Sequence, residues 1–211
     1  MWNHARQQTI YQTIHFALVS LALLLGGIPG TVLAVTPTQD WVARYNSTGN
    51  GADQPSALAV DTAGNTYVTG NSGTIKYSAS GSQLWIVPNG GAVIAVDNVS
   101  NSIYVTGSAT GTSTTTDFST IKYDANGNQQ WVKFYNGPSN GGDYATALAL
   151  DAAGNVYVTG SSSTWGTSMG MYYATVKYDA NGNQLWVARY NGGVNDIWAS
   201  SYAVAIAVDA S

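Results

Sequence analysis

The sequence contains no cysteine and no glutamate, and its two histidines, His4 and His15, stand near the N-terminus. The lack of cysteine excludes disulfides, thiolate metal sites and cysteine nucleophiles. Beyond residue 15 there is no imidazole, which removes Ser-His-Asp catalysis, histidine-rich zinc sites and histidine acid-base chemistry. An enzyme built on this sequence would depend on aspartate, tyrosine, lysine or an external cofactor, so we expect a protein that is not an enzyme.

Charge is also scarce. Only 9% of the 211 residues are charged, the formal net charge is -4, and the sequence pI is about 4.7. Nucleic-acid binders normally carry a clustered basic surface, so we expect no nucleic-acid partner. The chain is nevertheless 45% hydrophobic and contains 24 glycines, a composition that predicts a globular protein of strands and turns.

The N-terminal part resembles an export signal. Residues 16–35 are apolar, are interrupted by Gly26-Gly27 and Pro29-Gly30, and contain the small or apolar residues of a cleavage site at Val32-Leu33-Ala34. We expect a helical signal peptide over 1–34 and a secreted or extracytoplasmic domain over 35–211, at the cell surface or in the periplasm. The alternative is an uncleaved anchor, since the stretch is about long enough to span a bilayer, and this leader would then be the only membrane contact.

Four short phrases recur in the same order along the rest of the chain. They are SALAVD at 56–61, TYVTG at 66–70, TIKYS at 74–78 and QLWIV at 83–87, with later copies of each. The phrases are rich in β-branched and aromatic residues and are bounded by Gly, Asn, Asp or Ser, which predicts strands. The tryptophan of the fourth phrase returns at intervals of about 45 to 55 residues, in the range of propeller blades of four strands.

The phrases AVD-xx-GN-xYVTG, TIKYD-xxGN-QLW and ARYNG resemble the seven-bladed β-propeller repeat family, often abbreviated SBBP, which is found mainly in exported and cell-surface bacterial proteins. The resemblance covers 40–211 and implies an all-β propeller of four-stranded antiparallel blades. It carries no catalytic residues. The expected blades lie at about 57–87, 92–135 and 146–190, and single strands are expected at 40–45 and 203–209.

Three blades and two single strands are too few to close a propeller, because closed propellers have at least about four blades. The last phrase also stops at Asp209-Ala210-Ser211, inside a repeat. We therefore expect an incomplete or open propeller. Either the polypeptide is part of a longer one, which the stop inside a phrase favours, or another copy closes the array, and open blade edges allow such self-association.

The connections divide into two sets. Phrases one and two, and phrases three and four, are joined by short turns, whereas the other connections differ greatly in length, from the short 71–73 to the long loops expected at 108–119 and 161–173. In an up-and-down sheet the long loops share one end, where exposed aromatics suit a protein or carbohydrate partner. The alternative is that these side chains fold back over the blades. The candidate ligand-binding residues are Trp165, Met171, Tyr172, Asp196, Trp198, Asp143 and Tyr144.

Two sets of aspartates raise the question of a metal. The DANGN turns at 124–128 and 179–183 lack the glycine and glutamate positions of an EF-hand, so Asp124 and Asp179 are expected to accept turn hydrogen bonds. The aspartates that end the first phrase also precede tight turns and could alternatively form a ring of carboxylates near a channel. We expect no metal; if one binds, Asp97 and Asp151 are the pair to test.

The recurring tryptophans and tyrosines of the phrases, among them Trp85, Trp131, Trp186 and Tyr157, are expected to pack between blades. The sequence thus predicts a secreted or cell-surface protein with a structural or binding role, as an adhesion or scaffold module, without catalysis or cofactor. Two alternatives remain. DANG-NQLW faintly resembles the docking repeats of quinoprotein dehydrogenases, which would imply a cofactor-dependent enzyme, and the chain could also be a fragment of a longer propeller protein.

Overall fold

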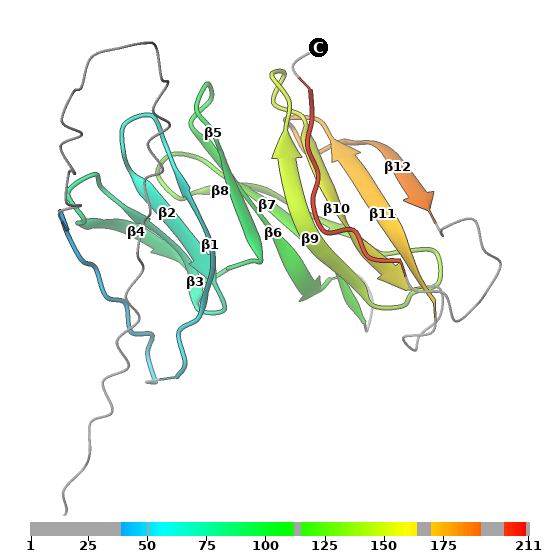
Figure 1. The fold of residues 1–211 in the computed structure, drawn as a ribbon, viewed down its shortest axis with the longest axis horizontal. Helices are drawn as coiled ribbons and strands as arrows, with labels where there is room; N and C mark the ends of the chain where they lie inside the picture. The colour runs from blue at the N-terminus through cyan, green and yellow to red at the C-terminus, as the bar shows by residue number, and fades with distance from the viewer. Residues whose placement is uncertain (1–38, 50, 112–114, 164–169, 191–200, 210–211) are drawn as a thin grey trace, which may run out of the picture. The chain divides into compact units, whose positions relative to one another are not determined.

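The computed structural model describes residues 39–49, 51–111, 115–163, 170–190 and 201–209. These residues form strands β1 to β12 and no helix, and the strands are arranged as three four-stranded antiparallel sheets (Figure 1). The predicted all-β architecture with four-stranded antiparallel units is confirmed. The predicted signal helix over 1–34 lies outside the described residues. Within the described ranges, no helix is long and apolar enough to cross a membrane.

Each sheet is an up-and-down meander in which chain neighbours are also sheet neighbours. The first sheet contains β1 (Pro55–Val60), β2 (Thr66–Gly70), β3 (Gly73–Tyr77) and β4 (Gln83–Val87). The second contains β5 (Val93–Asp97), β6 (Ser102–Thr110), β7 (Thr116–Tyr123) and β8 (Gln129–Tyr135). The third contains β9 (Asp143–Leu150), β10 (Val156–Ser163), β11 (Met171–Tyr178) and β12 (Gln184–Tyr190). This order follows from the tight turns between consecutive phrases.

The second and third sheets are longer than the phrases predicted. Residues 108–119 and 161–173 were expected to be loops, but β6 and β7 pair as far as Thr110 and Thr116, and β10 and β11 as far as Ser163 and Met171. The extra pairs place serine and threonine opposite aromatic or small residues, as in the pair Ser161 and Tyr173. The backbone ladder can form with these side chains as it does with aliphatic ones, and the cross-strand pairs contact one another. The two hairpins therefore continue beyond the predicted phrases.

The segments 40–45 and 203–209, expected to be single strands, are extended but are not strands in the structure. A strand requires a continuous ladder of backbone hydrogen bonds. The C-terminal segment instead makes isolated bonds to the third sheet: Ser201 N–H donates to the carbonyl oxygen of Met171 at 2.8 Å, and Thr146 Oγ1 donates to that of Ala203 at 2.8 Å. Figure 1 shows this segment running across β9.

The aspartate turns are built as their sequence predicts. Asp124 Oδ1 accepts from the backbone N–H groups of Asn126 and Asn128, each at 2.9 Å, and Asp179 does the same in the third sheet. Gly127 and Gly182 take positive φ angles of 85° and 81°. The carboxylate thus closes the turn while glycine supplies the left-handed position.

The hydrophobic core lies between the sheets. We call the side of a sheet that faces the next sheet along the chain, or that faces away from the preceding sheet, its front face, and the opposite side its back face. The first cluster joins front-face residues of the first sheet, such as Tyr67 and Trp85, to back-face residues of the second, such as Ile103 and Ile121. The second cluster joins front-face residues of the second sheet, such as Tyr104 and Phe118, to back-face residues of the third. Because successive side chains of a strand point to opposite faces, the strands of the second sheet contribute to both interfaces.

A shared hydrogen-bond arrangement locks both interfaces. Trp85 Nε1 and Lys76 Nζ donate to the carbonyl oxygen of Ala125 at 3.0 and 3.2 Å. One sheet later, Trp131 Nε1 and Lys122 Nζ donate to the carbonyl oxygen of Ala180 at 3.2 and 2.9 Å. We call each such set of tryptophan, lysine and turn carbonyl a clamp. The predicted packing role of Trp85 and Trp131 is confirmed.

Replacing Gly182 by alanine tests the clamp. A Cβ at this position would lie 2.9 Å from the Trp131 ring, and the φ of +81° is unfavourable for alanine. We expect Gly182→Ala to lower the free energy of unfolding by about 1–3 kcal/mol in urea denaturation. Gly51→Ala is the matched control, because a Cβ there meets nothing within 4 Å. Equal stability of the two variants would contradict the proposed role of the glycine.

Candidate functional site

The front face of the third sheet carries the residues of a further clamp. Ala149, Tyr157, Lys177 and Trp186 lie opposite one another on successive strands and therefore on one face. Tyr157, Lys177 and Trp186 occupy the positions that Tyr104, Lys122 and Trp131 hold in the second sheet. In the described part of the chain no further sheet covers them, and Trp186 is 41% exposed.

These side chains form a compact group with Asp151. Lys177 Nζ lies 4.7 Å from the centre of the Tyr157 ring and 3.6 Å from Asp151 Oδ2. Tyr157 donates its hydroxyl hydrogen bond to the same oxygen at 3.1 Å, and the Trp186 ring is 5.9 Å away at 66°. The interactions with Tyr157 and Asp151 raise the pKa of Lys177, so a cation stands beside two aromatic rings.

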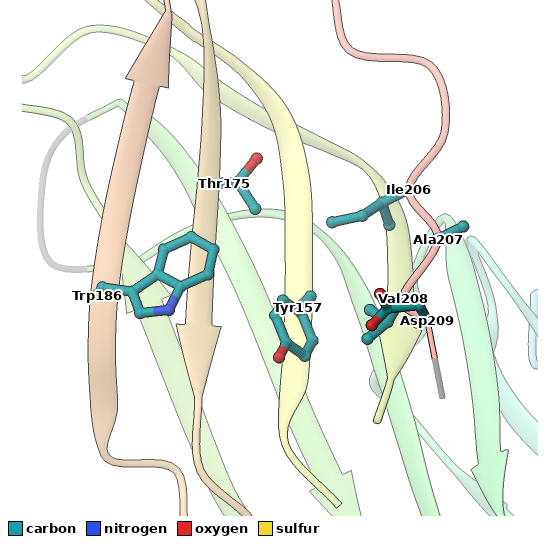
Figure 2. A pocket seen from close by; sticks show the side chains of 7 residues that line it. All are labelled: Tyr157, Thr175, Trp186, Ile206, Ala207, Val208 and Asp209. Carbon is teal, nitrogen blue, oxygen red and sulfur yellow. The ribbon is translucent and has the colours of Figure 1, made fainter. Parts of the chain in front are cut away.

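A cavity of about 740 Å³ opens beside this group (Figure 2). Tyr157, Thr175 and Trp186 line it on the side of the sheet, and Ile206 to Asp209 line it on the other side. The C-terminal segment therefore passes over the front face without filling the space beneath it. Aromatic rings next to a hydroxyl group and an ammonium group suit a partner with mixed apolar and polar surface.

A second aromatic group lies at the other end of the same face. Tyr144, Ser161, Tyr173 and Tyr190 are successive cross-strand partners, and the Tyr173 and Tyr190 rings are 5.9 Å apart. Tyr173 is 37% and Tyr190 57% exposed, whereas their counterparts Phe118 and Tyr135 in the second sheet are 1% and 7% exposed. We call Tyr144, Tyr157, Tyr173, Trp186 and Tyr190 together the aromatic face.

The predicted ligand-binding residues do not form a single surface in the described structure. Tyr144 belongs to the aromatic face and is exposed. Asp143 and Met171 are only 0% and 6% exposed and begin strands β9 and β11, so they do not belong to an exposed loop surface. Tyr172 is partly buried, with the Arg189 guanidinium 5.4 Å from its ring centre. The other three, Trp165, Asp196 and Trp198, lie outside the described residues.

Asp143 has a structural explanation instead. Its Oδ2 accepts from the Gly137 N–H at 2.6 Å, while Arg189 Nη2 donates to Ser162 Oγ on the adjoining strand at 3.1 Å. Burial raises the pKa of Asp143, and repulsion from Asp117 adds to the rise, although Gly137, Ser162 and Arg189 favour the charged form. The carboxyl group holds the chain before β9 against the third sheet, which the sequence pattern did not indicate.

The aspartates proposed as a metal pair are engaged in their own turns. Asp97 accepts from the Val99 N–H and the Ser100 hydroxyl at 2.9 and 2.6 Å. Asp151 accepts from the backbone of Ala153 and Asn155 as well as from Tyr157. Among the residues that the structure describes, no three His, Cys, Asp or Glu side chains are grouped as a metal site would need.

Sequence reasoning did not identify Tyr173, Tyr190 or Lys177 as surface residues, and it assigned Trp186 and Tyr157 to packing. The phrases themselves do not distinguish Trp186 and Tyr157 from Trp131 and Tyr104, which stand at the same positions of the second sheet and pack against the third. The same residue types therefore form a core in two copies and a surface in the third.

Comparison with known proteins agrees with the repeat pattern. Residues 40–74 match a family model described as SBBP, a beta-propeller repeat. This match confirms the resemblance to that family within the first copy of the phrases. No curated protein matches the chain.

The turn before β10 predicts a pH dependence. Burial opposes the charged form of Asp151, but hydrogen bonds from Asn155, Tyr157 and Ala153 outweigh it and lower its pKa from 3.8 to about 2. A depressed carboxyl pKa stabilises the fold above its unfolded value, about 3.9, and that stabilisation is lost as pH falls through the folded value. Asp151→Asn should therefore be less stable than the unmodified protein at neutral pH.

The difference in unfolding free energy between the two proteins, measured by urea titration, should shrink as the pH is lowered from about 4 toward about 2. Asp40→Asn controls for the change in net charge, since Asp40 is exposed. A difference between the Asp151→Asn variant and the unmodified protein that stays constant over this range would disprove the role assigned to the carboxylate.

Proposed function

We propose that this chain is a secreted or cell-surface module of a bacterium with a structural or binding role, and that it engages a protein or carbohydrate through the aromatic face. The observation that supports this proposal most directly is the exposure of Tyr173, Tyr190 and Trp186, whose counterparts in the second sheet are covered by the third. The N-terminal leader and the propeller repeats support export to the cell surface.

The chemistry of the face suits recognition. Tyrosine and tryptophan bury large areas with little loss of side-chain entropy, and they are enriched at protein interfaces. Lys177 and Thr175 stand among the rings and supply a cation and a hydroxyl group. Because the rings project from paired strands and not from loops, their spacing is set before a partner arrives.

A role without catalysis fits the use of the carboxylates. Asp151 accepts hydrogen bonds from its own turn and from Tyr157 and lies 3.6 Å from Lys177. The carboxylates of Asp61, Asp124 and Asp179 are likewise engaged by turn amides. A general acid or base needs a carboxyl group available to a substrate, and these groups are held by the fold.

Replacing the tyrosine pair tests the proposed surface. We expect Tyr173→Ser combined with Tyr190→Ser to weaken binding to a glycan array, or to purified surface proteins of the source bacterium, by at least about tenfold, because centrally placed aromatics dominate binding energy. Val99→Ser is the control, since Val99 is exposed in the turn before β6.

Unchanged binding by the double variant, at unchanged thermal stability, would show that the aromatic face is not the site. The pair Trp165→Ser and Trp198→Ser tests separately the two loop tryptophans that lie outside the described residues. If only that pair lost binding, the site would lie in the long loops.

A further inference from the structure

We propose that the partner of the aromatic face is a second copy of this chain, docked head to tail. In this arrangement the front face of the third sheet of one copy binds the back face of the first sheet of the next copy. The inference rests on the proposed function, because it identifies the partner of the same surface. Four features of the molecule support it: an incomplete clamp, an equivalent acceptor turn, two complementary apolar faces and two covering segments that form no strand.

The donor side of a clamp is present on the third sheet. In the two complete clamps a tryptophan and a lysine converge on one carbonyl oxygen, that of Ala125 or Ala180. On the third sheet the Trp186 ring is exposed, and Lys177 turns to Asp151 in the same sheet. Lys177 and Trp186 are thus a third tryptophan-lysine pair, and they are cross-strand partners as the pairs in the other two clamps are.

An acceptor turn of the same construction is present on the first sheet. Ser78 N–H donates to the carbonyl oxygen of Ser82 at 2.8 Å and Gly81 N–H to that of Ser78 at 2.9 Å, the same pattern as in the aspartate turns. Gly81 has a φ of 84°, and Ala79 stands where the other two turns have Ala125 and Ala180. A turn with the construction of the other two acceptor turns is therefore present on the first sheet.

Trp41 already occupies this turn from within the same copy. A Cβ on Gly81 would lie 2.7 Å from the Trp41 ring, much as one on Gly127 or Gly182 would meet Trp85 or Trp131. Trp41 thus stands in for the tryptophan of a preceding sheet. This contact shows that the first turn accepts an indole ring, the group that Trp186 would offer from another copy.

The apolar surfaces of the two ends also correspond. Leu58, Val60 and Ile86 lie on the back face of the first sheet and are exposed. The equivalent back-face residues of the second sheet, among them Ile94, Val105 and Ile121, are buried against the first sheet. The first sheet therefore exposes the kind of surface that a front face covers elsewhere in this molecule, and the third sheet exposes such a front face.

The segments that now lie over the two ends form no strand. Residues 203–209 run where β1 of a second copy would lie, because β1 packs beside β5 and β5 beside β9 inside the chain. The bonds of Ser201 and Thr146 tether this segment, and the cavity remains beneath it. Residues 40–45 form no strand either. Docking of a second copy would displace both segments. A clamp and an apolar interface like those between the sheets within one chain would take their place.

Photo-crosslinking of the full chain tests the geometry. Ala188 lies on the front face at the position of Lys133, whose Cε would be 2.8 Å from a Cβ on Gly182. Benzoylphenylalanine in place of Ala188 should therefore crosslink to the peptide that contains Ser78 to Ser82. Mixing isotopically labelled and unlabelled protein will show whether the two peptides come from different copies.

Sedimentation velocity of the full chain supplies the second measurement. We expect association that depends on concentration, weakened at least about tenfold by Lys177→Ala or Trp186→Ala and unchanged by Val99→Ala. Trp41→Ala should act in the opposite direction and strengthen association, because it frees the acceptor turn. Opposite signs for two tryptophan variants cannot result from a general loss of stability.

A chain that stays monomeric at every soluble concentration, including the Trp41→Ala variant, would overturn the inference. Crosslinks from position 188 to any surface other than the turn Ser78–Ser82 and the back face of the first sheet would do so as well. If the chain is monomeric but the Tyr173→Ser, Tyr190→Ser variant still loses binding to a glycan or a surface protein, only the identity of the partner is wrong. If that binding is also unaffected, the proposed function fails independently.

Discussion

The structure depends on a turn carbonyl that accepts two hydrogen bonds from the neighbouring sheet, one from an indole N–H and one from an ammonium group. Ala125 and Ala180 supply these carbonyl oxygens. The requirement explains the residues around them. Glycine is needed where the indole ring lies on the turn, aspartate holds the turn in shape, and the ammonium group of the lysine lies over a tyrosine ring. Each phrase of the repeat is therefore one component of an interface between sheets.

Because the interface is made of repeated components, the position of a residue in the array decides its role. Tyr104 is fully buried beneath the third sheet, whereas its counterpart Tyr157 lines an open cavity. The change needs no new residue type and no new backbone geometry, only the absence of a covering sheet within the described part of the chain. Recognition surfaces in arrays of this kind can thus be inferred by comparing each copy with its covered counterpart.

Much of the fold could be predicted from the sequence, because its signals are local. Strand periodicity and aspartate-glycine turns such as 124–128 depend on residues close in the chain, and both are confirmed. The extended hairpins were missed because serine and threonine there gave no aliphatic pattern. The exposure of Tyr190 depends on whether another sheet lies above it, and the burial of Asp143 depends on the chain before β9 that its carboxylate binds. The repeat pattern encodes neither.

The strand order also bears on how the chain reaches its native state. Every strand pairs with the strand that precedes or follows it, so each ladder closes only a short loop and loses little chain entropy. Such local topology is associated with rapid folding among β proteins, whose non-local pairings usually slow them. Because each sheet is closed by its own neighbouring strands, one sheet can form before the next is complete. Its tryptophan and lysine can then bind the turn carbonyl of the next sheet as that turn forms.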